Sequence, residues 1–242
     1  MSEIKRQVIA MGGGGFSMEP ENQLLDRYVI QQARKSRPTV CFLPHATDDA
    51  VRYTFRFFKA FTQLEVTPTH LSLFHPETAD LESFLMEQDV IYVGGGNTKS
   101  MIALWREWNL DDLLYKAYEN GTVLAGVSAG ANCWFQQCST DSIPGEFNML
   151  PCLGIIQGSF CPHYDGEVGR RASLHQLLSE NKILNGYAAD DGAAAHFING
   201  EFACAVSSRA HAKVYKVNKI DDQILEAAIA THYLGHLEGN VD

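Results

Sequence analysis

The segment VLAGVSAGANCW, residues 123–134, decides the fold. Its apolar first half predicts a buried strand, and the small residues around Ser128 predict a sharp turn into a helix over residues 129–138. GVSAG at 126–130 fits G-x-S-x-G, the tight strand-to-helix turn that lifts a serine hydroxyl above the carboxyl edge of a sheet. The first N–H groups of the helix would point to the same place and could stabilise an oxyanion. Ser128 is therefore a candidate nucleophile, and the alternative is that this small turn serves packing only.

Apolar strands and helices alternate along the chain before this segment. We expect strands within residues 6–15, 38–46, 66–74, 89–96 and 122–127, and helices within 19–36, 48–64, 79–88, 98–108 and 110–121. Beyond residue 150 the pattern changes to strands, with a hairpin turning at Asn199–Gly200. The alternation predicts an α/β fold: a mostly parallel sheet with helices on both faces, followed by a C-terminal β-hairpin. No linker or repeat is evident, so we predict a single domain over residues 1–242.

Composition excludes several classes of function. The chain has 242 residues, 45% of them hydrophobic, and a formal net charge of −10, which argues against binding to nucleic acid or an anionic membrane. The apolar run VIAM near the N-terminus is too short for a signal peptide. The six cysteines show no CxxC spacing, so we expect free thiols in the cytoplasm, no metal and no cofactor. Three glycines at 94–96 could cradle a phosphate, but the segment does not match the Walker motif, in which a glycine directly precedes a Lys-Ser/Thr pair.

A nucleophilic serine needs a base, and the chain offers nine histidines. His163 lies in a polar, glycine-containing loop after an apolar segment and is the first candidate. His45 ends the second predicted strand and could line the edge of a cleft, so it is the second candidate. His196 alternates within a predicted strand, which indicates a structural role. We expect Asn97 or Thr98 to cap the helix that follows the glycines.

Four motifs in order, VGGGNT, GVSAGAN, PHYDGE and ADDGAA, resemble those of the peptidase E and cyanophycinase family of serine peptidases. The resemblance covers roughly residues 5–218. It implies a class I glutamine amidotransferase-like fold and hydrolysis of small peptides after aspartate-type residues, such as dipeptides with an N-terminal aspartate or cyanophycin-like aspartyl peptides. It also implies a Ser-His-Asp type triad with an acyl-enzyme intermediate. The expected partner is a small peptide substrate, and a homodimer is the expected assembly.

The resemblance assigns roles to particular residues of this chain. Ser128 would be the nucleophile and His163 the base, with Asp191 as the best match for the acid, although relatives often have Glu there. Asp190 and Asp141 are the alternative acids. Backbone N–H groups of Gly96 and Ala129 would form the oxyanion hole, and Asn97 and Thr98 match residues that line the substrate cleft.

One departure from the family pattern concerns the substrate's carboxylate. Aspartyl dipeptidases of this type carry an arginine soon after a GET-like triplet, whereas this chain reads DGEVGRR. We expect Arg170 or Arg171 to contact the substrate carboxylate, because arginine binds it through a bidentate fork. The alternative is that both arginines cap an exposed helix.

Two other functions compete with a serine peptidase. The first is an α/β-hydrolase-type esterase, but there the chain order is Ser, acid, His, whereas here it is Ser, His, Asp. The second is a non-catalytic amidotransferase-like protein that kept the turn at Ser128 and binds a ligand.

Overall fold

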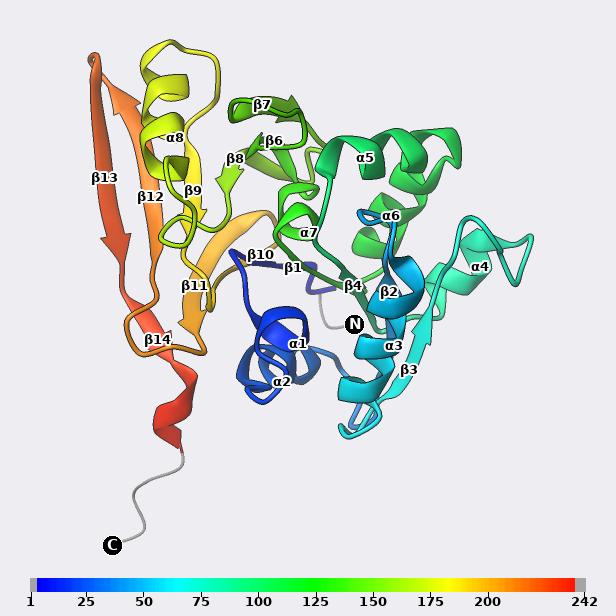
Figure 1. Cartoon of the computed structure of the whole chain (residues 1–242). Helices are drawn as coiled ribbons and strands as arrows, with labels where there is room; N and C mark the ends of the chain where they lie inside the picture. The colour runs from blue at the N-terminus through cyan, green and yellow to red at the C-terminus, as the bar shows by residue number, and fades with distance from the viewer. Residues whose placement is uncertain (1–3, 238–242) are drawn as a thin grey trace, which may run out of the picture.

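The computed structural model describes residues 4–237, and two β-sheets organise them (Figure 1). The larger sheet has the strand order β14-β11-β10-β1-β5-β4-β2-β3. Its strands are β1 (Gln7–Met11), β2 (Thr39–Leu43), β3 (Thr67–His70), β4 (Val90–Val93), β5 (Val123–Val127), β10 (Ala193–Ile198), β11 (Glu201–Ser207) and β14 (Thr231–Tyr233). Strands β1 to β5 all run parallel, which confirms the predicted mostly parallel sheet.

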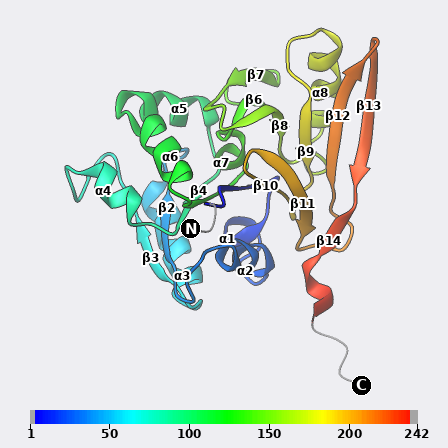
Figure 2. The ribbon, with the colours of Figure 1, turned by 180° about the vertical axis from the view of Figure 1, so that it is seen from behind.

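The smaller sheet has the order β13-β12-β9-β8-β6-β7 and was not predicted as a separate layer. Its strands are β6 (Phe135–Thr140), β7 (Asn148–Pro151), β8 (Ile156–Cys161), β9 (Gly186–Ala189), β12 (Val214–Ile220) and β13 (Gln223–Ile229). Figure 2 shows this sheet from behind, with β12 and β13 forming one long edge.

Helices cover both faces of the larger sheet. They are α1 (Gly15–Met18), α2 (Leu24–Gln31), α3 (Ala50–Phe61), α4 (Leu81–Met86), α5 (Thr98–Glu107), α6 (Leu110–Glu119), α7 (Ala129–Asn132) and α8 (Arg170–Ser179), with a final 3₁₀ turn at Leu234–Leu237. Alternate residues of a strand point to opposite faces. Ile9 of β1 therefore lies in the hydrophobic core between the sheet and helices α1, α2 and α3, while Val8 lies in the core between the sheet and helices α5 and α6.

The smaller sheet joins the α5 and α6 side of the larger one. Phe135 of β6 and Phe160 of β8 lie in the same buried cluster as Val8 and Trp105. The rings of the two phenylalanines stack, with their centroids 4.8 Å apart. Helix α8 covers the outer part of this second sheet, packing Leu174 and its neighbours against Val217 of β12.

The helix predicted after Ser128 is wrong over most of its length. It ends at Asn132, and the chain then enters β6, where Phe135 and Cys138 are buried and Gln136 is exposed. The pairing of β6 with β7 and β8 supplies the backbone hydrogen bonds that a longer helix would have made internally. The helix expected within residues 19–36 begins later, at Leu24, because residues 19–22 form a turn in which the Asn22 N–H donates to the Glu19 carbonyl oxygen.

The predicted hairpin is confirmed: β10 and β11 pair antiparallel around Asn199 and Gly200, whose φ angles are 52° and 85°. Both residues thus have the left-handed conformation that a two-residue hairpin turn requires. A single domain over residues 1–242 stays a prediction, and its ends, residues 1–3 and 238–242, lie outside the described residues. No helix within residues 4–237 has the length and apolar character needed to span a bilayer.

Candidate active site

Ser128 stands at a sharp turn at the carboxyl end of β5. Its backbone angles, φ 57° and ψ −117°, are rare for a residue with a side chain, as expected for a strained nucleophile turn. The turn requires glycine two residues before and two residues after Ser128, since a Cβ on Gly126 would lie 2.1 Å from the Gly130 carbonyl oxygen and a Cβ on Gly130 would lie 2.2 Å from the Val93 carbonyl oxygen. The Ser128 N–H donates to the carbonyl oxygen of Met11 at the end of β1, 3.1 Å away. Ser128 is therefore fixed at the edge where the parallel strands end.

His163 and Asp191 form a short hydrogen-bonded pair. His163 Nδ1 lies 2.6 Å from Asp191 Oδ1, and about one seventh of each side chain is exposed. The hydrogen bond from His163 is the main reason that the pKa of Asp191 is lowered, although burial opposes this shift. An ionised carboxylate can only accept, so Nδ1 carries the hydrogen and Nε2 of the neutral ring keeps its lone pair. That nitrogen is the one that can accept a proton from a nucleophile.

The glycines after β1 connect the serine to the His–Asp pair. Gly13 forms an isolated bridge with Asp191, and a Cβ on Gly13 would lie 2.0 Å from Asp191 Oδ1 and 3.0 Å from His163 Nδ1. Met11, two residues earlier, accepts the hydrogen bond from Ser128. Ser128 and the pair thus attach to the end of β1 within two residues of each other.

The glycines after β4 lie directly against Ser128. A Cβ on Gly95 would be 3.2 Å from the Ser128 Cβ and 3.7 Å from its Oγ. The Gly95 N–H donates to the Tyr53 hydroxyl, 3.2 Å away. By contrast, within residues 4–237 the N–H groups of Gly96 and Ala129 donate to no acceptor of the protein. These two unused donors are the pair that was predicted to bind an oxyanion.

The two predicted cleft residues make structural contacts. Asn97 caps α5, with Oδ1 accepting from the Ser100 N–H at 2.9 Å, and its amide donates to the Ser142 carbonyl at 3.0 Å. Thr98 is buried and its Oγ1 accepts from the Asn132 amide at 3.4 Å. Both residues hold α5 and the glycines at residues 94–96 in place beside Ser128.

The alternative acids point elsewhere. Asp190 Oδ2 accepts from the Lys213 N–H at 2.9 Å, and burial raises the pKa of this carboxyl group to about 6. Asp141 is exposed and lies 3.8 Å from Arg170. Of the three candidate carboxylates, the structure places Asp191 against His163.

Both predicted substrate arginines are engaged by carboxylates of the chain. Arg170 is buried, pairs with Glu167 and lies over the Phe147 ring, with Cζ 4.3 Å from the ring centroid. Arg171 pairs with Glu226 on β13. Both lie in the first turn of helix α8, whose N-cap is Gly169, and neither lines the cavity at Ser128.

The second candidate base, His45, has both ring nitrogens in use. Nε2 lies 2.9 Å from the Leu71 carbonyl oxygen and Nδ1 accepts from the Trp105 indole at 2.9 Å. Burial lowers the pKa of His45 to about 4. His196 pairs with the Tyr28 hydroxyl at 2.8 Å, and burial lowers its pKa to about 4 as well.

Sequence reasoning missed one wall of the site. A cavity of about 430 Å³ opens beside Ser128, and Arg52 and Arg56 of α3 are among the residues that line it. Their four-residue spacing, just after the loop that follows β2, was the available signal. It puts both side chains on one helix face near the carboxyl edge of the sheet.

A buried carboxyl group packs against the glycines that follow β1. Asp26 on α2 is fully buried and accepts a hydrogen bond from the Tyr92 hydroxyl, 3.1 Å away. Burial raises its pKa to about 7. A Cβ on Gly15 would lie 2.7 Å from the Tyr92 hydroxyl and 3.0 Å from Asp26 Oδ1, so the backbone at Gly15 packs directly on this pair.

In the part of the chain that the structure describes, no three His, Cys, Asp or Glu side chains are grouped so that they could hold a metal ion. The polar groups gathered at the sheet edge are a serine on a strained turn, a His–Asp pair and two unused N–H donors. These are the kinds of group that hydrolysis by a serine nucleophile requires.

Similarity to known proteins identifies the chain more closely as a serine peptidase. The model of peptidase family S51 matches residues 8–205, and the chain belongs to this family. The resemblance noted from the four motifs is thereby confirmed.

Individual relatives agree with the family. The uncharacterized peptidase YgaJ of Bacillus subtilis (strain 168) is 54% identical over 95% of this chain and 100% of its own length. Peptidase E of Haemophilus influenzae (strain Rd) is 28% identical, over 67% of this chain and 78% of its own. The crystal structure of a peptidase from an acI-B1 actinobacterium has the same fold, with a TM-score of 0.61 and 16% identity, covering 92% of this chain and 96% of the other.

Proposed function

We propose that this serine peptidase hydrolyses short peptides, namely dipeptides with an N-terminal aspartate or cyanophycin-like aspartyl peptides, through Ser128, His163 and Asp191. The observation that carries the proposal is the 2.6 Å contact between His163 and Asp191 at the sheet edge that also holds Ser128. Relatives named peptidase E support the class of substrate.

The reaction follows from the chemistry of these groups. Ser128 Oγ attacks the peptide carbonyl carbon while its proton passes to Nε2 of His163. Asp191 holds the Nδ1–H and stabilises the imidazolium ring as it forms. The carbonyl oxygen becomes an oxyanion, for which the N–H groups of Gly96 and Ala129 are the donors.

The tetrahedral intermediate then collapses. The C–N bond breaks, the amine leaves with the proton from His163, and the acyl group stays on Ser128. Water attacks this ester with His163 again acting as the base, which releases the acid and restores the serine. Every step uses groups of the chain and water.

Dipeptide hydrolysis by the wild type and by Ser128→Ala tests the proposal. The panel varies the N-terminal residue, Asp against Asn and Ala, with free and blocked α-amines side by side. We expect hydrolysis of Asp-Leu by the wild type and a loss of at least about 10³-fold in Ser128→Ala, because the nucleophile and base act as a unit. Cleavage of esters but of no peptide would favour the esterase, and retained activity in a clean Ser128→Ala preparation would overturn the nucleophile assignment.

A cytoplasmic location and a homodimeric assembly also remain proposals. Cell fractionation tests the first, and light scattering of the purified protein tests the second.

A further inference from the structure

One wall of the cavity beside Ser128 carries more positive than negative charge. Arg52 and Arg56 project from α3, and Asp49, the residue that precedes this helix, is the acidic residue among those that line the cavity. The chain as a whole has a net charge of −10. Two arginines against one aspartate reverse the sign of the local charge at this place, and a field confined to a cleft attracts an anionic ligand.

Arg56 is anchored to the framework around Ser128. Its guanidinium donates to the Ser17 carbonyl oxygen and lies 6.0 Å from the centroid of the Tyr53 ring. Tyr53 in turn accepts from the N–H of Gly95, which touches Ser128. The hydrogen-bond partner of Arg56 is the neutral Ser17 carbonyl, and among residues 4–237 no carboxylate forms an ion pair with this guanidinium.

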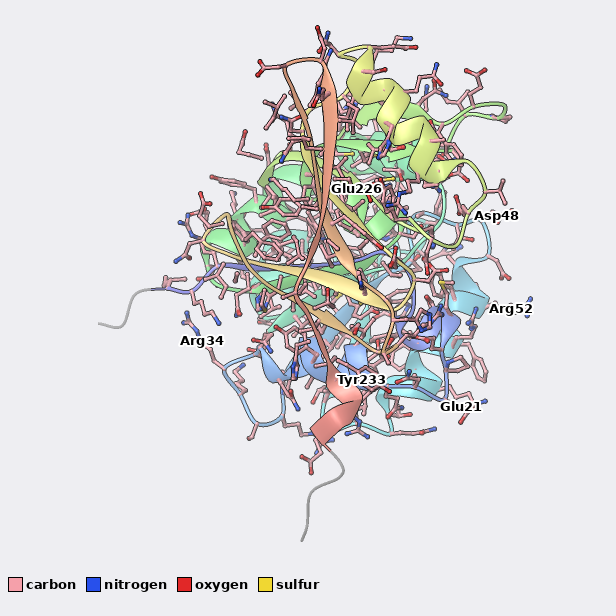
Figure 3. The ribbon with its side chains drawn as sticks, turned by 90° about the vertical axis from the view of Figure 1, so that its left-hand side faces the viewer. Glu21, Arg34, Asp48, Arg52, Glu226 and Tyr233 are labelled. Atoms are coloured by element: carbon pink, nitrogen blue, oxygen red, sulfur yellow. The ribbon has the colours of Figure 1, made fainter. Side chains whose placement is uncertain are left out.

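Arg52 is exposed like Arg56 but has no protein group within hydrogen-bond distance of its guanidinium among the described residues. Figure 3 shows it at the edge of the molecule, and 78% of its side chain is exposed. The only carboxylate of residues 4–237 within ion-pair distance is Asp49, whose Oδ2 is 4.0 Å from Nη1, too far for a hydrogen bond. Arg170 and Arg171, by comparison, are hydrogen-bonded to Glu167 and Glu226. The planar fork of Arg52, which lines the cavity, is therefore not hydrogen-bonded to a carboxylate of residues 4–237.

We propose that Arg52, with Arg56 behind it, forms a carboxylate-binding subsite of this peptidase. The proposal rests on Ser128 being the nucleophile, as proposed above, since the subsite is defined by its place in the same cavity. Arginine suits this role because its paired N–H groups match the two oxygens of a carboxylate. Two carboxylates of an aspartyl dipeptide have this chemistry: the aspartate side chain and the free C-terminus.

Binding measurements separate the subsite from catalysis. Isothermal titration calorimetry on Ser128→Ala, which cannot turn over the ligand, compares Asp-Leu with Asn-Leu and with Asp-Leu amide. Arg52→Gln is then added to this background, with Arg106→Gln, an exposed arginine outside the cavity, as the matched control.

Arg52→Gln should weaken binding of Asp-Leu about tenfold, equal to about 1.4 kcal/mol, and Arg106→Gln should leave it unchanged. The analogue that lacks the carboxylate bound by Arg52 should be insensitive to Arg52→Gln. Insensitivity of Asn-Leu assigns the aspartate side chain to the subsite, and insensitivity of Asp-Leu amide assigns the C-terminus. Equal weakening of all three ligands, no weakening, or no binding of any of them overturns the subsite.

Failure of the subsite and failure of the proposed function give different results. Labelling of Ser128 by an uncharged fluorophosphonate, together with dipeptide hydrolysis by the wild type, reports the nucleophile. A protein that is labelled and hydrolyses Asp-Leu, but shows no selective effect of Arg52→Gln, retains the proposed function and refutes the subsite.

Discussion

Replacing Asp191 by Asn tests the proposed triad at its most specific contact. The substitution keeps the size of the side chain but removes the negative charge that lies 2.6 Å from His163 Nδ1. Its amide can also donate to Nδ1, which would fix the ring with its hydrogen on Nε2, the wrong nitrogen for a base. We therefore expect a folded protein with a sharply reduced kcat.

The size of the loss follows from the charges involved. In the transition state His163 becomes an imidazolium facing the Asp191 carboxylate, and two unit charges about 4 Å apart at an effective dielectric constant of 20 attract each other by about 4 kcal/mol. That energy equals about 10³-fold in rate, and the wrong tautomer adds to it, so we expect kcat to fall by about 10³ to 10⁴-fold.

The assay is steady-state hydrolysis of the best dipeptide of the panel. Asp141→Asn is the matched control, since Asp141 is exposed and contacts Arg170 instead of His163, and its kcat should stay within about threefold of the wild type. Asp190→Asn tests the other alternative acid. If Asp191→Asn keeps kcat within tenfold of the wild type, or if one of the other two variants loses more, the assignment of the acid is refuted.

Three further perturbations follow from the same geometry. Gly13→Ala should lower kcat/KM by about 10²-fold without unfolding the protein, because its Cβ would displace the Asp191 carboxylate; kinetics and circular dichroism together check this, and full activity would contradict it. For Asp26, the pKa of about 7 in the folded protein exceeds the unfolded value, so the wild type should lose stability as pH rises from about 4 to 7. In urea unfolding, the free energy of unfolding of Asp26→Asn should rise relative to that of the wild type by on the order of 4 kcal/mol across that range. If the two free energies change with pH in parallel, Asp26 is not a buried titrating carboxyl group. Burial alone would raise the pKa of Glu226, but hydrogen bonds from Tyr164 and two other side chains outweigh burial and lower this pKa. Glu226→Gln should therefore destabilise the protein by about 1–3 kcal/mol at neutral pH, and the difference from the wild type should shrink below about pH 4. A difference that stays constant at all pH values would refute this role.

The sequence predicted those parts of the molecule that depend on local pattern. The strands β1, β2, β4 and β5 follow from apolar runs, of which those of β1 and β4 end in glycines, and the turn at Asn199 follows from its conformational preference. The second sheet was missed because β6 begins only three residues after α7 ends, with no glycine or proline between them, so its first residues read as the continuation of a helix. Its strands are defined by partners such as β8, which no local pattern reveals.

Site residues were predictable by type but not by orientation. Asp190 and Asp191 are neighbours, and adjacent side chains of an extended chain point to opposite sides, so spacing alone could not decide which one meets His163. The partner of Arg171, Glu226, is 55 residues away on β13, and only the tertiary structure brings the two together.

The division of the proposed triad between two sheets has a consequence for folding kinetics. Ser128 leaves the larger sheet at β5, His163 leaves the smaller sheet at β8, and Asp191 lies where the chain passes from β9 of the smaller sheet to β10 of the larger one. An intermediate with both sheets formed but not yet docked would have native-like secondary structure and no working site. During refolding, recovery of far-ultraviolet circular dichroism should therefore precede recovery of turnover, and the delay between the two would time the docking of the layers.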